Sequence, residues 1–468
     1  MPKNVQRLGA YGLVALLGLP AVSASDIDVG VLLDILVEKG VLTRDEVDRA
    51  IERSQRATAQ AQPPPVVTVP FEPTEALSDR PANTRVRRFG VETADGQDRF
   101  RIRGRFQLDY GYVDWDNAFA TIDGDLSRYG TLVRRARLGA LGVWNRDWEW
   151  QMEVDFRDNE IRFANTYIAW LGMHDARLAV GNFKEPISME SSTSSRRVTF
   201  LERAAPIDAY RPDREMGVLY ETLREDYYVG LGVFGGEGVT SERRIHEGYS
   251  LAGRGSYAIV NETDHFLHIG GSLNYRKNAY RARAGRNREY VDVRLRTRTG
   301  TRTVDGRLIG RNDVANVRFI ERGGLEVAGG TGPYAFQAEY IQARLDRDFG
   351  LPTLSFSGWY AQTMWNITGE SHNYRATSGD FGLPRVNKPF GTLDGGPGLW
   401  QVAFRFATAD SISHDHDGHK MDHWTLGFNW YPIPEIVFKL NLMRFEAENA
   451  AGQRTRGNAI GFRAQLEF

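Results

Sequence analysis

The sequence contains no cysteine, so neither disulfide bonds nor thiolate metal sites hold the fold together. It has no excess of either charge, because 59 lysines and arginines stand against 60 aspartates and glutamates, which argues against a nucleic-acid-binding protein. The mean hydropathy of −0.44 excludes a bundle of membrane helices, and the long apolar run Leu13–Val22 is too short to span a bilayer. Lysine is scarce: only 7 of the 59 basic residues are lysine, and the rest are arginine.

The first 98 residues differ from the rest of the chain. Lys3 and Arg7 precede an apolar stretch and a run of small residues that ends at Ala24, which predicts a secretory signal peptide over 1–24. Helical spacing of apolar residues predicts a short helical periplasmic arm over 25–58, and a Pro-rich composition predicts an extended linker over 59–98. Because so small a helical pair cannot bury its own apolar face, we expect it to self-associate as a coiled coil or to dock onto a periplasmic partner, with a mostly mobile arm as the alternative.

From residue 99 onward, apolar and polar residues alternate with a period of two. In 99–113, apolar residues such as Phe100 and Ile102 alternate with Arg101 and Arg103. Such a segment is longer than the roughly five or six residues of an average strand in a soluble sandwich. Long strands with one apolar and one polar face, and with Trp and Tyr at their ends, are typical of an outer-membrane β-barrel, in which closure of the sheet pairs every backbone group.

The alternation predicts an all-β protein: a sixteen-stranded antiparallel transmembrane β-barrel over residues 99–468. The strand count is even, as single-chain bacterial barrels require, and a short alternating run at 289–298 is therefore assigned to a loop. A barrel of this size has a water-filled lumen, which favours a channel. The predicted strands are 99–113, 130–144, 147–158, 162–172, 175–184, 214–222, 226–236, 247–260, 263–276, 316–329, 332–345, 353–367, 398–410, 421–432, 434–446 and 456–468.

Three long connections, 185–213, 277–315 and 368–397, interrupt the predicted meander. We expect them to be lids or inserts folded into the lumen. With both chain ends in the periplasm, the first two connections belong to the outer side and the third to the periplasmic side.

Arginine gathers around the second of these connections. Between Arg276 and Arg322, 14 lysines and arginines face 5 aspartates and glutamates. Four arginines in this region are spaced two or four residues apart, so in an extended segment their guanidinium groups lie on one side. The next strand adds Arg318. Guanidinium offers paired planar donors that suit oxyanions, so a column of such groups predicts an anion-selective path, with a solvated basic loop as the alternative. The residues with these spacings are Arg294, Arg296, Arg298 and Arg302.

Signals for other chemistry are weaker. His414, His416 and His419 lie in one short connection, where a metal site is a minor alternative to a polar loop. The sequence has no G-x-S-x-G, H-E-x-x-H or P-loop motif, so we expect neither an enzyme nor a cofactor.

From about residue 99 to the end, the chain resembles the phosphate-selective porins O and P. The resemblance rests on many short segments in the same order along the chain: Gly104–Tyr110, Arg134–Gly139, Glu153–Phe156, Val180–Pro186, Ser194–Arg203, Gly324–Ala328, Thr368–Glu370, Gly427–Tyr431 and Arg463–Phe468.

This resemblance implies a homotrimer of barrels whose loops constrict each pore, with an arginine ladder that conducts phosphate, pyrophosphate or similar anions. Arg134 and Arg135 match the arginine pair of the second strand, and Arg196 matches a position where relatives can carry lysine. We also expect contact with outer-membrane lipid and lipopolysaccharide, and recognition of Phe468 by the barrel-assembly machinery. The alternative is a general porin whose periplasmic arm is a structural tether of the envelope. The candidate anion pathway is Arg101, Arg103, Arg134, Arg135, Arg196, Arg197, Arg294, Arg296, Arg298, Arg302 and Arg318.

Overall fold

The computed structural model describes residues 44–45, 85–87, 89–116, 128–157, 160–235, 246–282, 288–304, 307–309, 313–391 and 395–468. The chain divides into two units, 1–80 and 81–468, and the second unit contains the β-sheet. The predicted signal peptide, almost all of the predicted helical arm and most of the predicted linker lie outside the described residues. No helix in the described residues is long and apolar enough to cross a membrane.

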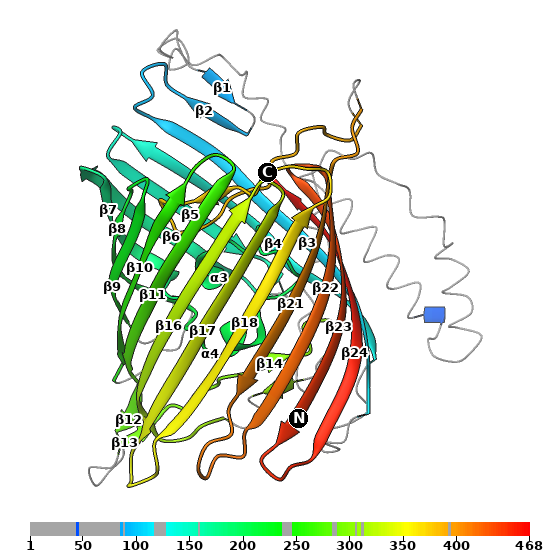
Figure 1. Cartoon of the computed structure of the whole chain (residues 1–468). Helices are drawn as coiled ribbons and strands as arrows, with labels where there is room; N and C mark the ends of the chain where they lie inside the picture. Colours follow the sequence, from blue (N-terminus) through cyan, green and yellow to red (C-terminus); the bar gives the residue numbers. More distant parts are fainter. Residues whose placement is uncertain are drawn as a thin grey trace. The chain divides into compact units, whose positions relative to one another are not determined.

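The second unit is a closed antiparallel barrel of sixteen strands, in which each strand pairs with its neighbour along the chain and β24 pairs with β3 (Figure 1). The predicted fold is therefore confirmed, and the strand bounds differ from the predicted ones by at most three residues. The wall consists of β3 (Arg99–Trp115), β4 (Tyr129–Trp144), β5 (Trp148–Asp155), β6 (Arg162–Met173), β7 (Ala176–Lys184), β8 (Arg214–Thr222), β9 (Tyr227–Gly235), β10 (Tyr249–Asn261), β11 (His265–Lys277), β16 (Val317–Thr331), β17 (Tyr334–Arg347), β18 (Leu354–Asn366), β21 (Leu399–Asp410), β22 (His419–Ile433), β23 (Ile436–Asn449) and β24 (Arg454–Glu467).

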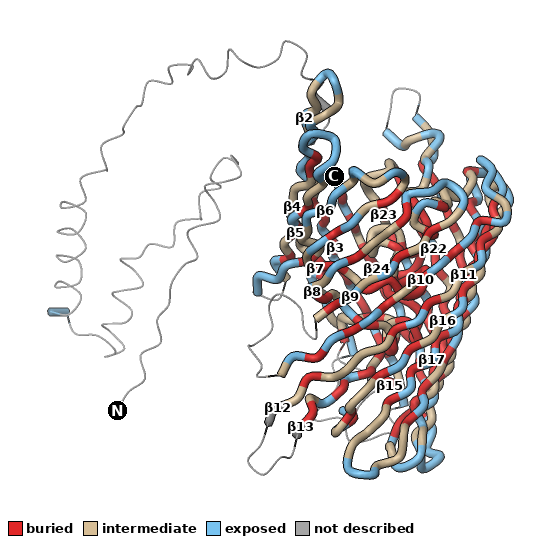
Figure 2. The backbone as a smooth tube through the Cα atoms, turned by 90° about the vertical axis from the view of Figure 1, so that its left-hand side faces the viewer, coloured by how far each residue is buried: buried red, intermediate tan, exposed pale blue. Residues whose placement is uncertain are grey.

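Side chains alternate between the outside of the barrel and its lumen. Along β3, Phe106, Leu108 and Tyr110 are exposed, whereas Gln107 and Asp109 between them are buried. Figure 2 shows this change from exposed to buried residue by residue along the strands. The exposed faces are apolar and the enclosed faces polar, which is the distribution that lipid outside and water inside require.

All three long connections contribute side chains to the interior. We call the end at which β3 begins and β24 ends the proximal end, and the opposite end the distal end. The connection 185–213 starts from the distal end and carries α3 (Met189–Ser192) and α4 (Ala205–Tyr210), and α4 contacts β17, β18 and β21. The distal connection 278–316 carries β12 (Tyr280–Ala282), β13 (Arg288–Tyr290), β14 (Thr297–Arg298) and β15 (Arg307–Ile309), and the proximal connection 367–398 carries β19 (Tyr374–Arg375) and β20 (Asp380–Phe381).

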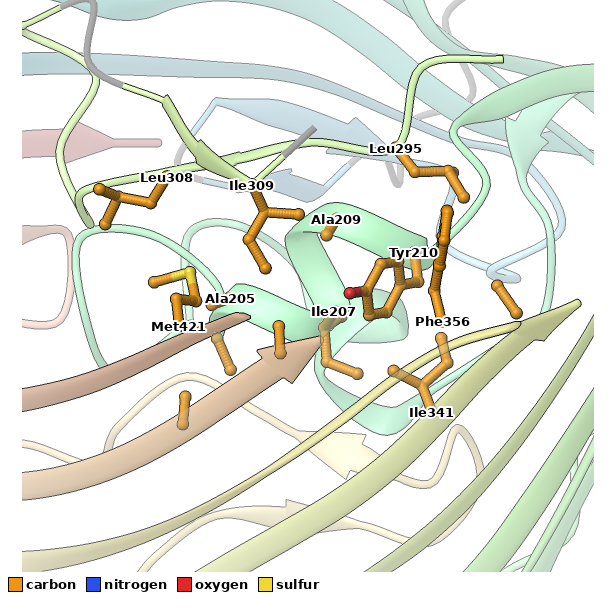
Figure 3. Packing of buried hydrophobic residues seen from close by; sticks show 14 of the residues in the cluster. Ala205, Ile207, Ala209, Tyr210, Leu295, Leu308, Ile309, Ile341, Phe356 and Met421 are labelled. Carbon is orange, nitrogen blue, oxygen red and sulfur yellow. The ribbon is translucent and has the colours of Figure 1, made fainter. Parts of the chain in front are cut away.

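An apolar cluster inside the barrel joins the two distal connections to each other. Ile207 and Tyr210 of α4 are fully buried, and they pack in one cluster with Leu295 and Ile309 of the other connection and with Phe356 of β18 (Figure 3). Burial of several such side chains, each contributing roughly 1.5–3 kcal/mol, holds both connections within the lumen. The two distal connections therefore occupy part of the lumen and narrow it.

At the proximal end, a short hairpin extends the sheet beyond the predicted start of the barrel. β1 (Arg85–Arg87) pairs with β2 (Gly90–Glu92), and β2 pairs with the first residues of β3. The predicted linker 59–98 therefore includes strand structure, because β2 extends the sheet along the edge of β3 that β24 leaves free. The rings of Phe89 and Phe468 meet there with their centroids 4.9 Å apart.

Candidate functional site

A cavity of about 400 Å³ lies towards the distal end of the lumen, between the two distal connections and the wall. Four of the arginines that were predicted to share one side line this single cavity, together with basic residues of the wall and of the first connection. The basic residues that line this distal cavity are Arg211, Arg276, Arg294, Arg296, Arg298, Arg302 and Arg322.

The alternation in the second connection explains this grouping. Val293 and Leu295 are buried in the apolar cluster, so the arginines between and after them point the other way. Arg302 is fixed by Asp208 of α4 at 2.9 Å, and Glu202 lies 3.4 Å from it. The Asp208 carboxylate raises the pKa of Arg302 above its ordinary value despite burial, so this guanidinium stays charged.

Arg318 lies apart from this set. It forms an ion pair with Asp346 at 2.7 Å, and its guanidinium stacks 4.9 Å from the centre of the Phe319 ring. Its side chain is 43% exposed and does not line the distal cavity. Arg322, further along β16, lines the cavity instead and donates to the Tyr210 carbonyl at 2.7 Å.

A second basic cavity, of about 370 Å³, lies towards the proximal end. Three of the predicted pathway residues line it: Arg103 from β3, and Arg196 and Arg197 from the first connection. Arg101, two residues before Arg103, is exposed and does not line it. The other basic residues around this proximal cavity were not among the predicted pathway residues; they are Arg105, Arg137, Arg177, Lys184, Arg214 and Arg375.

Two of these residues, Arg105 and Arg137, continue the same alternation of side chains as predicted pathway residues. Arg105 follows Arg103 by two residues, and Arg137 follows Arg135 by two, so each lies on the same face as a predicted residue. Lys184 and Arg214 flank the connection 185–213, and no local pattern indicates that the ends of two short strands line a cavity.

Arg197 is the least constrained cation of the proximal cavity. Its Nε atom is buried without a hydrogen-bond partner among the described residues. Burial, with the nearby charges of Arg375 and Arg196, lowers its pKa to about 10, so it is still protonated at neutral pH. A charged group with an unused donor in a basic cavity is suited to bind an anion.

Arg134 and Arg135 both face the lumen although they are consecutive. A β-bulge in the pairing of β3 with β4 aligns Gln107 with Arg135 and Leu108 with Val133, so Arg134 has no direct partner. Arg134 donates to both oxygens of Glu202, at 2.6 and 3.0 Å, and Arg135 donates to Gln107 at 2.7 Å. Both line the wall behind the first connection and neither lines the two cavities.

The two cavities adjoin at residues 211–215, which run from the end of α4 into the start of β8. Arg211, Asp213 and Glu215 line the distal cavity, whereas Arg214 lines the proximal one. Glu185 of the proximal cavity is bonded to Arg276 of the distal cavity at 2.6 Å. This segment therefore contributes side chains to the linings of both cavities.

The three histidines do not form a common site. The His416 ring packs against Phe356 in a tilted arrangement, His419 is buried next to Ser411, and His414 adopts a positive φ of 49° in the turn. In the described part of the chain, no group of three or more His, Asp and Glu side chains has an arrangement that could hold a metal ion.

Comparison with known proteins identifies the family. The chain is 29% identical over 447 residues to an uncharacterized protein of Caulobacter vibrioides. The alignment covers 90% of this chain and 86% of the relative. It is 25% identical over 414 residues to Porin O of Pseudomonas aeruginosa, covering 81% of this chain and 90% of the relative. Among solved structures it is similar to an anion-selective porin from Comamonas acidovorans, with 13% identity and a TM-score of 0.48 over 79% of this chain and all of that one. The family model of the phosphate-selective porins O and P matches residues 100–468. The chain therefore belongs to the phosphate-selective porin O and P family and is a porin of the bacterial outer membrane.

Proposed function

We propose that this protein is an anion-selective channel whose path runs through the distal and proximal cavities and which conducts phosphate, pyrophosphate or similar oxyanions. Arg294, Arg296, Arg298 and Arg302 receive the anion at the distal side, and Arg103, Arg196 and Arg197 receive it at the proximal side. We further propose that the protein acts as a homotrimer, with the proximal end and the N-terminal arm in the periplasm.

The observation that carries the proposal is the accumulation of guanidinium groups around two enclosed polar cavities in a chain that is nearly neutral. The distal cavity has seven arginines in its lining, and the proximal cavity has eight arginines and one lysine. The carboxylates in the linings are fewer. Enclosed like charges raise the local concentration of counter-ions and exclude cations, which favours anion flux.

The side-chain type favours oxyanions over halides. A guanidinium group offers parallel donors to two oxygens of one phosphate, and such charge-assisted bonds contribute roughly 1.5–3 kcal/mol each. Conduction requires that no single site hold the ion too tightly, so several sites of similar strength suit transport better than one strong site.

The double variant Arg296→Ala, Arg298→Ala tests this path in planar bilayers. In a salt gradient, we expect its reversal potential to move towards zero, and we expect phosphate to block the chloride current with a half-blocking concentration at least about tenfold higher than in the wild type. Arg296→Lys should retain anion selectivity but weaken the block, because a point charge lacks the planar pair of donors.

Arg318→Ala is the matched control. It removes one arginine of the same strand-and-loop region, but this side chain is paired with Asp346 outside the distal cavity. The proposal predicts that its reversal potential and phosphate block match those of the wild type. If the double variant also matched the wild type, the distal arginines would not be part of a conducting path.

A further inference from the structure

One carboxylate differs from the other acidic groups where the two cavities meet. The side chain of Asp213 is 78% exposed although it lies within the barrel. The acidic residues around it are held by arginines: Glu185 and Glu215 by Arg276, at 2.6 and 2.9 Å. Asp213 is therefore the carboxylate at this point that is open to the cavity.

Two arginines face Asp213 at distances longer than a hydrogen bond. Arg211 lies 3.7 Å and Arg214 lies 3.9 Å from its Oδ1 atom. Good charge-assisted bonds are about 2.7–2.9 Å long, so both contacts are loose. Arg211 is extended before Pro212, as a residue before proline prefers, and this conformation puts Arg211 and Asp213 on the same side of the segment.

Unlike Arg276, the neighbouring Arg214 and Lys184 have no carboxylate of the described residues within hydrogen-bond distance. Arg214 donates to the side-chain oxygen of Asn165 at 2.8 Å, and Lys184 donates to the backbone carbonyls of Ser191 and Thr193. Arg214 therefore has no carboxylate bond that an arriving anion would have to break, apart from its loose contact with Asp213.

We infer that Asp213 is an internal competitor of the permeating anion: its carboxylate occupies Arg211 and Arg214 in the empty channel and yields them to an oxyanion that makes shorter bonds. This inference rests on the proposed function. It adds a residue that determines which anions bind at Arg211 and Arg214 and how readily they are released. When the anion moves on, the carboxylate neutralises the two arginines again, so the junction does not retain the ion.

The charge of Asp213 is present under physiological conditions. The partial loss of hydration inside the barrel opposes its ionisation, but Arg211 and Arg214 together hold the pKa of this carboxyl below its ordinary range. A competitor of fixed charge also discriminates among anions, because an ion that cannot offer two oxygens to the guanidinium groups has little advantage over the carboxylate it must replace.

The experiment measures phosphate block of chloride current for the wild type, Asp213→Asn and Asp213→Glu in planar bilayers. We expect the Asn variant to lower the half-blocking phosphate concentration about tenfold and to slow phosphate release, because the competitor is lost. The Glu variant has a longer reach to the same arginines, so we expect it to raise the half-blocking concentration above that of the wild type.

Asp292→Asn separates competition from a general effect of charge. Asp292 is an exposed aspartate beside the distal arginines, and no described arginine forms an ion pair with it. Its effect on block should be lost in 1 M salt, where the Debye length is about 3 Å, whereas direct competition by Asp213 should persist.

Three outcomes overturn the inference. Equal shifts for Asp213→Asn and Asp292→Asn at high salt, or no shift for Asp213→Asn in a wild-type channel that is anion-selective, would reject Asp213 as a competitor and leave the proposed function intact. A wild-type channel without anion selectivity would reject the proposed function and this inference together.

Discussion

Arginines inside this barrel have two different roles: some neutralise buried carboxylates, and others have donors left for an anion. Their hydrogen-bond partners distinguish the two groups. Arg463 is bound to Asp109 at 2.6 and 2.7 Å and Arg254 to Glu326 at 2.7 Å, with all four side chains almost fully buried. These pairs neutralise charge that the enclosed interior could not otherwise tolerate. Arg197, with an unused donor at a cavity, has the opposite character. The total number of arginines in the lumen therefore overstates the number available to an anion.

The buried ion pair of Arg134 with Glu202 can be tested by mutation. Its partner Glu202 belongs to the first connection, and both side chains are less than 10% exposed. Arg134→Ala leaves a buried carboxylate without its two closest bonds, so we expect the free energy of unfolding to fall by about 3–5 kcal/mol, measured by denaturant unfolding in detergent. Cleavage of the connection 185–213 by protease should increase in parallel.

The comparison for Arg134→Ala is Arg128→Ala. Arg128 pairs with Asp114 at 3.4 Å, and both side chains are more than half exposed. A pair of this kind contributes about 0–1 kcal/mol, so the free energy of unfolding should hardly change. A loss as large as that of Arg134→Ala would show that burial does not determine the strength of these pairs.

Among the elements, the connections rather than the strands determine the shape of the open space in the lumen. The segment around Gly300 crosses the lumen to the opposite wall, where a Cβ atom on Gly300 would lie 2.6 Å from the Met443 sulfur and 2.7 Å from the His423 ring. Its φ of +87° also favours glycine. This close approach keeps the connection against β22 and β23 and leaves the distal cavity on the other side.

Gly300→Val should therefore displace the connection and widen the lumen. We expect a larger single-channel conductance and a weaker anion selectivity, because Arg298 and Arg302 move with the segment. Gly332→Val is the control, since this glycine also has a positive φ, of 51°, but has open space around it in a turn at the proximal end. An unchanged conductance for Gly300→Val would mean that the wall contact does not hold the connection in place.

The strands could be predicted from the sequence because each follows a local rule, the alternation imposed by lipid outside and water inside. The cavities could not be predicted in the same way, since they depend on how connections pack against distant strands. Arg318 illustrates the limit: the pairing of β16 with β17 is irregular between Val317 and Phe319, and the side chain there pairs with Asp346 instead of lining the cavity. Arg294, Arg296 and Arg298 could be grouped because their segment is extended, although its place in the lumen has no local signal.

For the whole molecule, closure of the barrel depends on the pairing of β24 with β3. Phe468 exchanges backbone hydrogen bonds with Gly104, at 2.9 and 3.2 Å, and its ring fills the space where a Cβ on Gly104 would lie. Phe89 covers the other side of the ring. The seam is thus completed by residues from the beginning and the end of the folded unit.

Removal of Phe468 should accordingly lower the yield of closed barrel. The expected result is a smaller fraction of protein that shifts mobility on heating in detergent gels, with the remainder unfolded or degraded. Phe390→Ala is a suitable comparison, because this exposed aromatic residue packs against Trp430 away from the seam. An undiminished yield without Phe468 would contradict a role of this residue in assembly.

The inward connections have an electrical consequence. Because they occupy the lumen, we expect the resistance to ion flow along the proposed path to be concentrated between the two cavities, near 211–215, and most of an applied voltage to fall across that short distance. A unit charge that crosses 100 mV changes in energy by about 2.3 kcal/mol, so a dianion that crosses half of the drop changes its occupancy about fiftyfold. Anions in the distal and proximal cavities lie on opposite sides of this drop. Reversing the voltage should therefore move a blocking anion from one cavity to the other, and the polarity of block identifies the cavity that it occupies.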